Sequence, residues 1–389
     1  MTVYAPSAPP TSRAGSRWLI LVIACLAQFM VVLDATIVNV ALPSIQHGLH
    51  FSPSSLQWVV NAYTLTFGGF LLLGGRAGDL IGRKRLFMAG VALFSAASLL
   101  NGLAQSSGML IVGRGLQGLG GALLSPAALS IITTTFTEQG ERTKALGVWS
   151  AIAAGGGAVG LILGGALTQL ASWEWIFIVN VPVGIATLLA TLRYVPESRA
   201  DMEHRTFDLA GAVTVTGGLV VLVYAIVKAQ SFGWGSARTV GLIAASLVLL
   251  AAFVAIERRS KAPLIRLSIF RVKTLTVANV VLLLVASGLF GMFFFASLYV
   301  QEILGYSPLR AGLAFLPVTG GIVVGAGIAQ QLIRRAGVRN VSLVGVGMAT
   351  VGLVLLAGVP VHGTYAGDLL PGLVVMSIGM GLTFVPITL

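Results

Sequence analysis

The sequence predicts an all-α membrane protein that crosses the bilayer many times. Apolar residues make up 56% of the 389 residues, whereas Asp, Glu, Lys and Arg together make up only 9%. About a quarter of the residues in an ordinary soluble domain are charged, so this chain lacks the polar surface that a soluble protein exposes to water. Disorder is also excluded, because disordered chains combine low hydrophobicity with high charge. The apolar residues come in runs of about 20, the length of a membrane-spanning helix.

Twelve such runs follow one another along the chain. They are about twice as long as the strands of a membrane β-barrel, so each is expected to be a helix. The polar residues 1–17 form an expected cytoplasmic tail, and the first run is too long for the core of a cleaved signal peptide. The predicted spans are 18–40, 56–75, 86–104, 109–132, 144–169, 174–193, 208–228, 239–257, 275–299, 309–331, 340–358 and 368–389.

The basic residues predict how these spans are oriented. The net charge of +12 first suggests a nucleic-acid partner. However, if the N-terminus is cytoplasmic, 20 of the 24 Lys and Arg residues fall in the segments on the cytoplasmic side and 3 in the outer segments. Such a bias is the positive-inside pattern of multi-pass proteins of the cytoplasmic membrane. It accounts for the charge, and no nucleic-acid partner is expected.

Metal-ligand and nucleotide motifs are missing from the sequence. Cys25 is the single cysteine, and the four histidines lie between the predicted spans without metal-ligand spacing. There is no phosphate-binding Walker loop, so direct drive by ATP is not expected. We find no nucleophile–base pair either. The sequence therefore predicts a protein that is not an enzyme and needs no metal or cofactor.

Two ionisable residues lie within predicted spans. Asp34 is about 25 Å along the first helix from Arg17, and Arg114 is about 10 Å deep from the opposite side, at 1.5 Å per residue. In a bilayer core of ~30 Å the two charges can share a layer. Charges within the membrane are costly and mark ion or substrate paths. We expect Asp34 to take up a proton or a cationic substrate and Arg114 to balance it; the alternative is a static pair that only fixes packing. Three further polar residues are candidates for the same site: Asn39, Asn61 and Gln117.

The loop expected between the second and third spans is short, basic and rich in glycine. Its glycines allow a tight turn and close helix approach. Asp79 lies at the C-terminal end of a predicted helix, where the helix dipole disfavours a carboxylate. It is therefore expected to pair with a cation or with the N-terminus of a neighbouring helix. One interpretation is a gate, a charge pair that holds the cytoplasmic side closed and breaks when the protein changes conformation. The other is that the cations only set the orientation of the spans in the membrane. The candidate gating residues are Gly75, Arg76, Gly78, Asp79, Gly82, Arg83 and Lys84.

Glycines recur in the fifth span. From Gly156 to Gly164 they are spaced by four, so three of them line one helix face and allow another helix to approach closely. The full set is Gly147, Gly156, Gly160, Gly164 and Gly165. Plain helix packing and a functional role are both compatible with this pattern.

Several of these stretches together resemble the major facilitator superfamily, and in particular its fourteen-span drug:proton antiporters. The resemblance covers the whole chain. Segment 75–85 resembles the superfamily's loop signature, with Leu80 where Arg is usual, and segment 33–43 resembles the first-span signature of the antiporters. Segment 114–122 resembles the fourth-span motif with its proton-linked arginine. The glycines of span five fit the antiporter motif, but Leu161 replaces its proline. Segment 173–182 resembles a sixth-span signature, with Glu174 where Arg is usual.

The resemblance implies two pseudo-symmetric helical bundles with two extra helices between them. The expected parts are the cytoplasmic tail 1–17, a six-helix bundle 18–193, a linker plus two inserted spans 194–273, and a C-terminal bundle 274–389. The last bundle holds four of six spans, so we expect a C-terminally truncated member with about 12 of 14 spans; the alternative is a complete twelve-span protein.

The implied function is export of an amphipathic drug or antibiotic in exchange for protons, by a monomer that uses alternating access. A proton-coupled metabolite transporter and a non-transporting membrane sensor with the same fold remain open at this stage, because a fold does not fix a function.

Overall fold

The computed structural model describes residues 14–199, 208–260, 263–265 and 267–388. Most of the predicted tail 1–17 lies outside the described residues, as does 200–207 of the predicted linker. Four of the basic residues assigned to the cytoplasmic side also lie outside them, namely Arg13, Arg205, Lys261 and Arg266.

The described residues form helices and connecting turns without a strand. Every predicted span overlaps one helix or two successive helices, and two of the spans share α12. The α-helices are α1 (Ala14–Gly48), α2 (Pro53–Ile81), α3 (Arg83–Gly102), α4 (Ser107–Thr135), α5 (Gln139–Leu170), α6 (Trp175–Ile178), α7 (Asn180–Tyr194), α8 (Leu209–Phe232), α9 (Ala237–Arg259), α10 (Lys273–Leu298), α11 (Pro308–Ala314), α12 (Leu316–Ala357) and α13 (Leu370–Thr388). One 3₁₀ segment, Leu267–Arg271, and two π-helical segments, Tyr299–Ile303 and Tyr365–Leu369, adjoin them.

Ten helical stretches of the described chain are long and apolar enough to cross a membrane. One of them, Pro308–Ala357, has 50 residues and contains two of the predicted spans. Gly337 interrupts it with a φ of 78° and a ψ of 159°, values that favour glycine and end the regular helix. A loop was predicted between the spans 309–331 and 340–358, and in the structure Gly337 is the single non-helical residue there. The predicted number of twelve spans stays a prediction.

Polar caps explain where several helices begin. Ser52, Ser106, Ser236 and Ser307 each accept a hydrogen bond from the backbone N–H three residues on, and Asp208 does the same for Gly211. These bonds satisfy N–H groups that have no partner within the helix.

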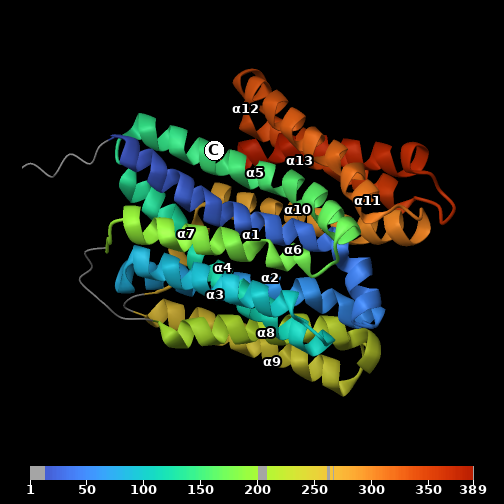
Figure 1. The fold of residues 1–389 in the computed structure, drawn as a ribbon, viewed down its shortest axis with the longest axis horizontal. Coiled ribbons are helices and arrows are strands. Elements are labelled where there is room, and N and C mark those ends of the chain that lie inside the picture. Colours follow the sequence, from blue (N-terminus) through green and yellow to red (C-terminus); the bar gives the residue numbers. More distant parts are fainter. Residues whose placement is uncertain (1–13, 200–207, 261–262, 266, 389) are drawn as a thin grey trace, which may run out of the picture.

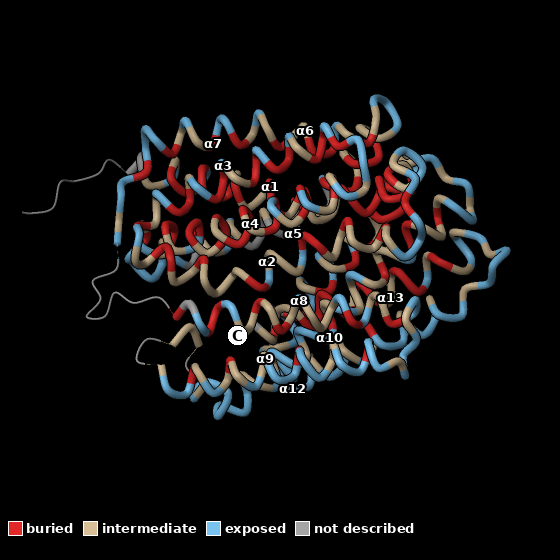
Figure 2. Tube along the Cα trace, turned by 90° about the horizontal axis from the view of Figure 1, so that it is seen from below, coloured by how far each residue is buried: buried red, intermediate tan, exposed pale blue. Residues whose placement is uncertain are grey.

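The helices α1 to α7 pack together as a central bundle, in which α7 follows α6 directly (Figure 1). The pair α8 and α9 packs along one side, against α2, and α12 packs on α13 beyond α5. Burial is concentrated in the central bundle, while α9, α10 and α12 are largely exposed (Figure 2). We call the end with Arg17, Arg83 and Arg193 the basic face, and the end with Gly48, Ser106 and Ala171 the far face.

Glycines allow the closest helix contacts in both parts of the molecule. A Cβ on Gly90 would lie 2.6 Å from the Leu124 nitrogen, and one on Gly120 would lie 2.6 Å from the Phe94 nitrogen, so α3 and α4 touch at backbone distance. Between α12 and α13, a Cβ on Gly379 would lie 2.6 Å from the Gly345 carbonyl oxygen. Small residues at helix contacts are how membrane helices gain van der Waals packing.

The loop predicted between the second and third spans is much shorter than expected. α2 continues to Ile81 and α3 begins at Arg83, so Gly75 to Asp79 are helical and only Gly82 lies between the helices. Gly82 has a φ of 122°, which lets the chain reverse in one residue. The prediction of a loop over this segment was therefore wrong. The polar residues that suggested a loop extend a helix beyond its apolar part.

Candidate functional site

A fully buried charged pair lies inside the central bundle. Arg114 on α4 donates from Nη1 to Asp34 Oδ2 on α1 at 2.5 Å. Both residues are at most 1% exposed, and they are 80 positions apart in the sequence. Arg114 Nε also donates to the carbonyl oxygen of Val59 on α2, at 2.9 Å. A buried pair is held only where hydrogen bonds satisfy the remaining donors and acceptors, and this guanidinium bridges three helices.

Gln117 is the centre of the hydrogen bonds around this pair. Its Nε2 donates to Asp34 Oδ1 at 2.7 Å and to Ser98 Oγ at 2.6 Å. Its Oε1 accepts from Arg114 Nη1 and from Asn101 Nδ2, both at 2.7 Å. The two carboxylate oxygens of Asp34 thus accept from different donors. Each carboxylate oxygen has a second lone pair, so Asp34 can bind a proton without losing these donors.

Aromatic rings and unpaired oxygens complete the surroundings. The Arg114 guanidinium carbon lies 4.4 Å from the centre of the Tyr63 ring and 5.7 Å from that of Phe177. Asn180 on α7 points its Nδ2 at Asp34 Oδ1 from 3.5 Å, the limit of hydrogen-bond distance. Among the described residues, Tyr63 Oη, Asn101 Oδ1 and Asn180 Oδ1 are buried without a hydrogen-bond partner. Buried unpaired oxygens are uncommon, so the cluster has unused acceptors available for a second arrangement.

Small residues on α4 make room for the cluster. A Cβ on Gly113 would overlap Asn101 Oδ1, and one on Gly118 would overlap the Tyr63 carbonyl oxygen. The glycines on either side of Arg114 and Gln117 therefore bring α2 and α3 close enough for their polar groups to reach the buried charges.

Asn39 and Asn61 lie outside this cluster, although both were predicted to belong to the same site. The Asn39 amide donates to Ala35 and Thr36 carbonyl oxygens on its own helix. Asn61 lies on the side of α2 that lines a separate cavity. Helical spacing explains the difference, because Asn39 and Asn61 are on other faces of α1 and α2 than Asp34 and Val59.

The candidate gating residues lie at the basic face. Asp79 accepts from Arg83 Nη2 at 3.1 Å, four residues along the chain. The N-terminus of α3 is covered by a residue that the sequence did not single out: the Glu197 carboxylate, which follows α7, accepts from the Lys84 and Arg85 backbone N–H groups at 3.1 and 3.3 Å. Lys84 Nζ donates to the Leu192 carbonyl oxygen at 3.1 Å. These contacts join α2, α3 and the end of α7 within the central bundle. Gly75 and Gly78 lie in the last turns of α2, and Arg76 lies between them.

The glycines of α5 divide into two groups. A Cβ on Gly156, Gly160 or Gly164 would press on α1, against Val32, Thr36 and Ile37 respectively. One on Gly165 would lie 2.5 Å from the Pro308 carbonyl oxygen on α11. Gly147 has no neighbour within 4 Å among the described residues, so the expected close approach does not extend to it. The spacing of four predicted the shared face correctly because it follows the helix turn.

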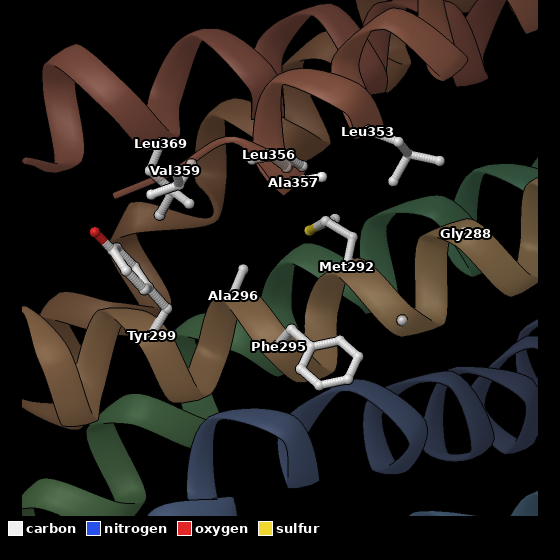
Figure 3. Close-up of a pocket in the computed structure, with 11 residues that line it drawn as sticks. Gly288, Met292, Phe295, Ala296, Tyr299, Leu353, Leu356, Ala357, Val359 and Leu369 are labelled. Carbon is white, nitrogen blue, oxygen red and sulfur yellow. The ribbon is translucent and has the colours of Figure 1, made fainter. Parts of the chain in front are cut away.

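Two cavities flank α10. One, of about 540 Å³, lies between α10, α12 and the Tyr365–Leu369 segment, where Met292, Ala296 and Tyr299 project towards Leu353, Leu356 and Val359 (Figure 3). The other, of about 240 Å³, lies between α2 and α10 and is lined by Gln57, Val60, Asn61, Phe290, Gly291, Phe294 and Phe295. Helix α2 separates the second cavity from the charged cluster by one residue: the Val59 carbonyl accepts a hydrogen bond from Arg114, and Val60 lines the cavity. The lining of this cavity combines aromatic and apolar walls with two amide groups, and its volume is below the ~300–1,000 Å³ of common ligand pockets.

The sequence did not point to Ser98 and Asn101 as partners of the charged pair. The signal was present, because both are polar residues within the apolar run 86–104. What was missing is which face of α3 meets α4, and that depends on the packing of Gly90 and Gly120.

Comparisons with known proteins agree with this architecture. The family model described as Major Facilitator Superfamily matches residues 24–389. The chain is 43% identical over 373 residues to puromycin resistance protein pur8 of Streptomyces alboniger, covering 95% of this chain and 74% of that protein. It is 39% identical over 380 residues to cephamycin export protein CmcT of Amycolatopsis lactamdurans, covering 97% and 78%.

Solved structures share the fold at low sequence identity. The xylose transporter XylE from E. coli, in a partially occluded inward-open conformation, is 12% identical with a TM-score of 0.61, covering 96% of this chain and 84% of that chain. A bacterial homologue of the lysosomal transporter Spinster, in an inward-facing conformation, is 16% identical with a TM-score of 0.59, covering 97% and 75%.

Proposed function

The chain belongs to the major facilitator superfamily, and on this premise we propose that it exports amphipathic antibiotics or drugs across the cytoplasmic membrane in exchange for protons. Membership makes it a multi-pass membrane transporter rather than an enzyme. Export of small antibiotics is supported by relatives named for puromycin resistance and cephamycin export. Proton coupling and alternating access are the further steps of the proposal.

The observation that carries proton coupling is the buried cluster around Asp34. We assign Asp34 as the proton-accepting group, Arg114 as its counter-charge and Gln117 as the residue that holds both in place. When Asp34 takes up a proton it no longer balances Arg114, and the guanidinium then has its strongest remaining partners in Val59 and Gln117. A charge left unpaired in a membrane is costly, so this change biases the bundle towards another arrangement.

We further propose the orientation and division of the chain. The N-terminus is cytoplasmic, which makes the basic face the cytoplasmic side, as the bias of Lys and Arg supports. Residues 18–193 and 274–389 are the two moving parts, and 194–273 connects them with two inserted spans. The contacts of Asp79, Arg83 and Lys84 lie within residues 18–193, so they support a role in keeping α2, α3 and α7 together as one moving part.

The test is transport in everted membrane vesicles energised by a proton gradient. Accumulation of a panel of amphipathic dyes and antibiotics and the internal pH are followed together, for the wild-type chain and Asp34→Asn. We expect the wild type to accumulate one or more compounds and to release protons in step with them, and Asp34→Asn to lose the proton-driven accumulation.

The matched control is Glu138→Gln. Glu138 precedes α5, its side chain is exposed, and it accepts no capping hydrogen bond from the helix. This variant should transport at the wild-type rate. Accumulation by Asp34→Asn at the wild-type rate, with the same proton release, contradicts the assigned role of Asp34.

A further inference from the structure

The first helix contains a proline that frees one of its carbonyl groups. Pro43 lies inside α1 and has no backbone N–H. In a regular helix that N–H would donate to the carbonyl oxygen four residues earlier, which is that of Asn39. Asn39 is 4% exposed and Val40 is fully buried, so water does not supply the missing donor. A buried carbonyl without a partner is costly, and its partner has to come from another helix.

Side chains of α10 supply that partner. Ser297 Oγ, which is fully buried, donates to the Asn39 carbonyl oxygen at 2.6 Å. Gln301 Nε2 donates to the next carbonyl oxygen, that of Val40, at 2.9 Å and to Ser297 Oγ at 3.1 Å. Gln301 lies in the π-helical segment Tyr299–Ile303, which continues α10. Such segments often accompany functional positions in helices.

These contacts join two parts of the chain that are about 260 positions apart. Together with one further hydrogen bond between the bundle α1–α7 and segment 273–388, they lie on the side of the molecule towards the far face. The third is the one from the Leu309 N–H to Gln169 Oε1, at 3.2 Å. Close packing of α5 on α11 accompanies them, because a Cβ on Gly165 would lie 2.5 Å from the Pro308 carbonyl oxygen. The two parts are thus fastened together at the far face.

We propose that Ser297 and Gln301 form a latch on the carbonyl groups of Asn39 and Val40, and that this latch keeps the far face closed. The inference rests on the proposed transport cycle, in which the far face has to open. Pro43 makes the latch specific, since it leaves the Asn39 carbonyl without a helical donor. The latch is also placed to respond to the charged cluster, because Asp34 lies five residues before Asn39 on the same helix.

The test measures opening directly and does not depend on transport. Spin labels are attached to cysteines at His47 and Glu302, in a Cys25→Ala background, and distances between the labels are measured by pulsed electron paramagnetic resonance. These two side chains lie at the far face, on α1 and next to α10, with 76% and 44% of their surface exposed and 3.7 Å between them. Ser297→Ala should raise the ratio of open to closed populations about fivefold, the effect of one buried hydrogen bond, and Gln301→Leu should shift it in the same direction.

A rescue variant separates the latch from a general loss of packing. Pro43→Ala restores a helical N–H for the Asn39 carbonyl, so Ser297→Ala in that background should change the ratio less than about twofold. The matched control is Ser287→Ala on the same helix, whose hydroxyl donates only to its own helix, to Leu283. It should leave the distances unchanged.

Unchanged distances in both Ser297→Ala and Gln301→Leu overturn the latch, as does an equal effect of Ser297→Ala with and without Pro43. If the distances shift as expected but the wild type moves no compound in vesicles, the proposed function fails and the latch stands.

Discussion

The central bundle α1–α7 and the segment α10–α13 use the same helical packing but differ in what they bury. The bundle encloses an arginine, a carboxylate and four uncharged polar side chains in one cluster: Asp34, Ser98, Asn101, Arg114, Gln117 and Asn180. The buried polar residues described in α10–α13 are Ser297, Ser377 and Thr383, and none is charged. The cavity beside α12 is correspondingly apolar.

This difference indicates a division of work between the two parts. The buried charges Asp34 and Arg114 lie in the bundle, while the second segment supplies apolar walls and the donors that fasten it to α1. The cavity between α2 and α10 lies at their border, with amide groups from the first part and phenylalanines from the second. Changes on either side of this border therefore have different expected effects.

The largest expected effect is the loss of the buried cation. Arg114→Met leaves the carboxylate of Asp34 buried without its charged partner and removes the bond to the Val59 carbonyl. Breaking a buried ion pair in this way costs about 3–5 kcal/mol of folding free energy. Thermal unfolding in mild detergent should show a much lower Tm for Arg114→Met than for the wild type.

The second part provides the control for this prediction. Arg310→Met removes an exposed guanidinium that lies 3.8 Å from the centre of the Tyr306 ring, and its Tm should stay close to that of the wild type. Asp34→Asn combined with Arg114→Gln should recover part of the lost stability, because no buried charge remains, yet should not transport. An equal loss of Tm in Arg114→Met and Arg310→Met would contradict the division between the two parts.

A smaller effect is expected where the two parts are alike. A Cβ on Gly164 would lie 2.8 Å from both Cγ1 and the carbonyl oxygen of Ile37, so Gly164→Ala should cost about 1–3 kcal/mol through overpacking. Gly379→Ala should cost a similar amount between α12 and α13. Gly147→Ala and Gly327→Ala meet nothing within 4 Å and should be neutral or stabilising by up to about 1 kcal/mol, since Ala favours helices. The free energies of unfolding of the four variants, measured under identical conditions, show whether the loss of stability follows the packing around each glycine or the part of the chain in which it lies.

Much of the fold was predictable because each span is one long apolar run. The predicted spans 56–75 and 109–132, for example, lie within α2 and α4. That Asp34 and Arg114 can share one layer could be predicted as well, because a helix advances by a fixed rise per residue, and the two side chains do meet. The end of α2 was predicted wrongly, since polar residues beyond the membrane stay helical as far as Ile81.

The partners across helices could not be read from the sequence. Residues such as Gln117 and Asn101 meet only because glycines set the distance and rotation of α3 and α4. The same limit hid the contact between Ser297 and Asn39, which lie 258 positions apart. Helical spacing gives the residues on one face, whereas the face that meets a given neighbour is decided by packing over the whole bundle.

The smallest expected effect concerns the border cavity. Asn61 is one of two amide groups in a lining that is otherwise apolar and aromatic, apart from Gly291. If an amphipathic substrate binds there, Asn61→Leu removes about one hydrogen bond, and the KM of a transported compound should change about fivefold. Proton release for each molecule transported should not change, because the hydrogen bonds described for Asp34, Arg114 and Gln117 go to other residues than Asn61. Thr64→Val is the matched control, since its exposed hydroxyl donates only to its own helix, at Val60. A change in proton release with an unaltered KM would instead assign Asn61 to the cluster around Asp34, and the border between the two parts would have to be drawn on the other side of α2.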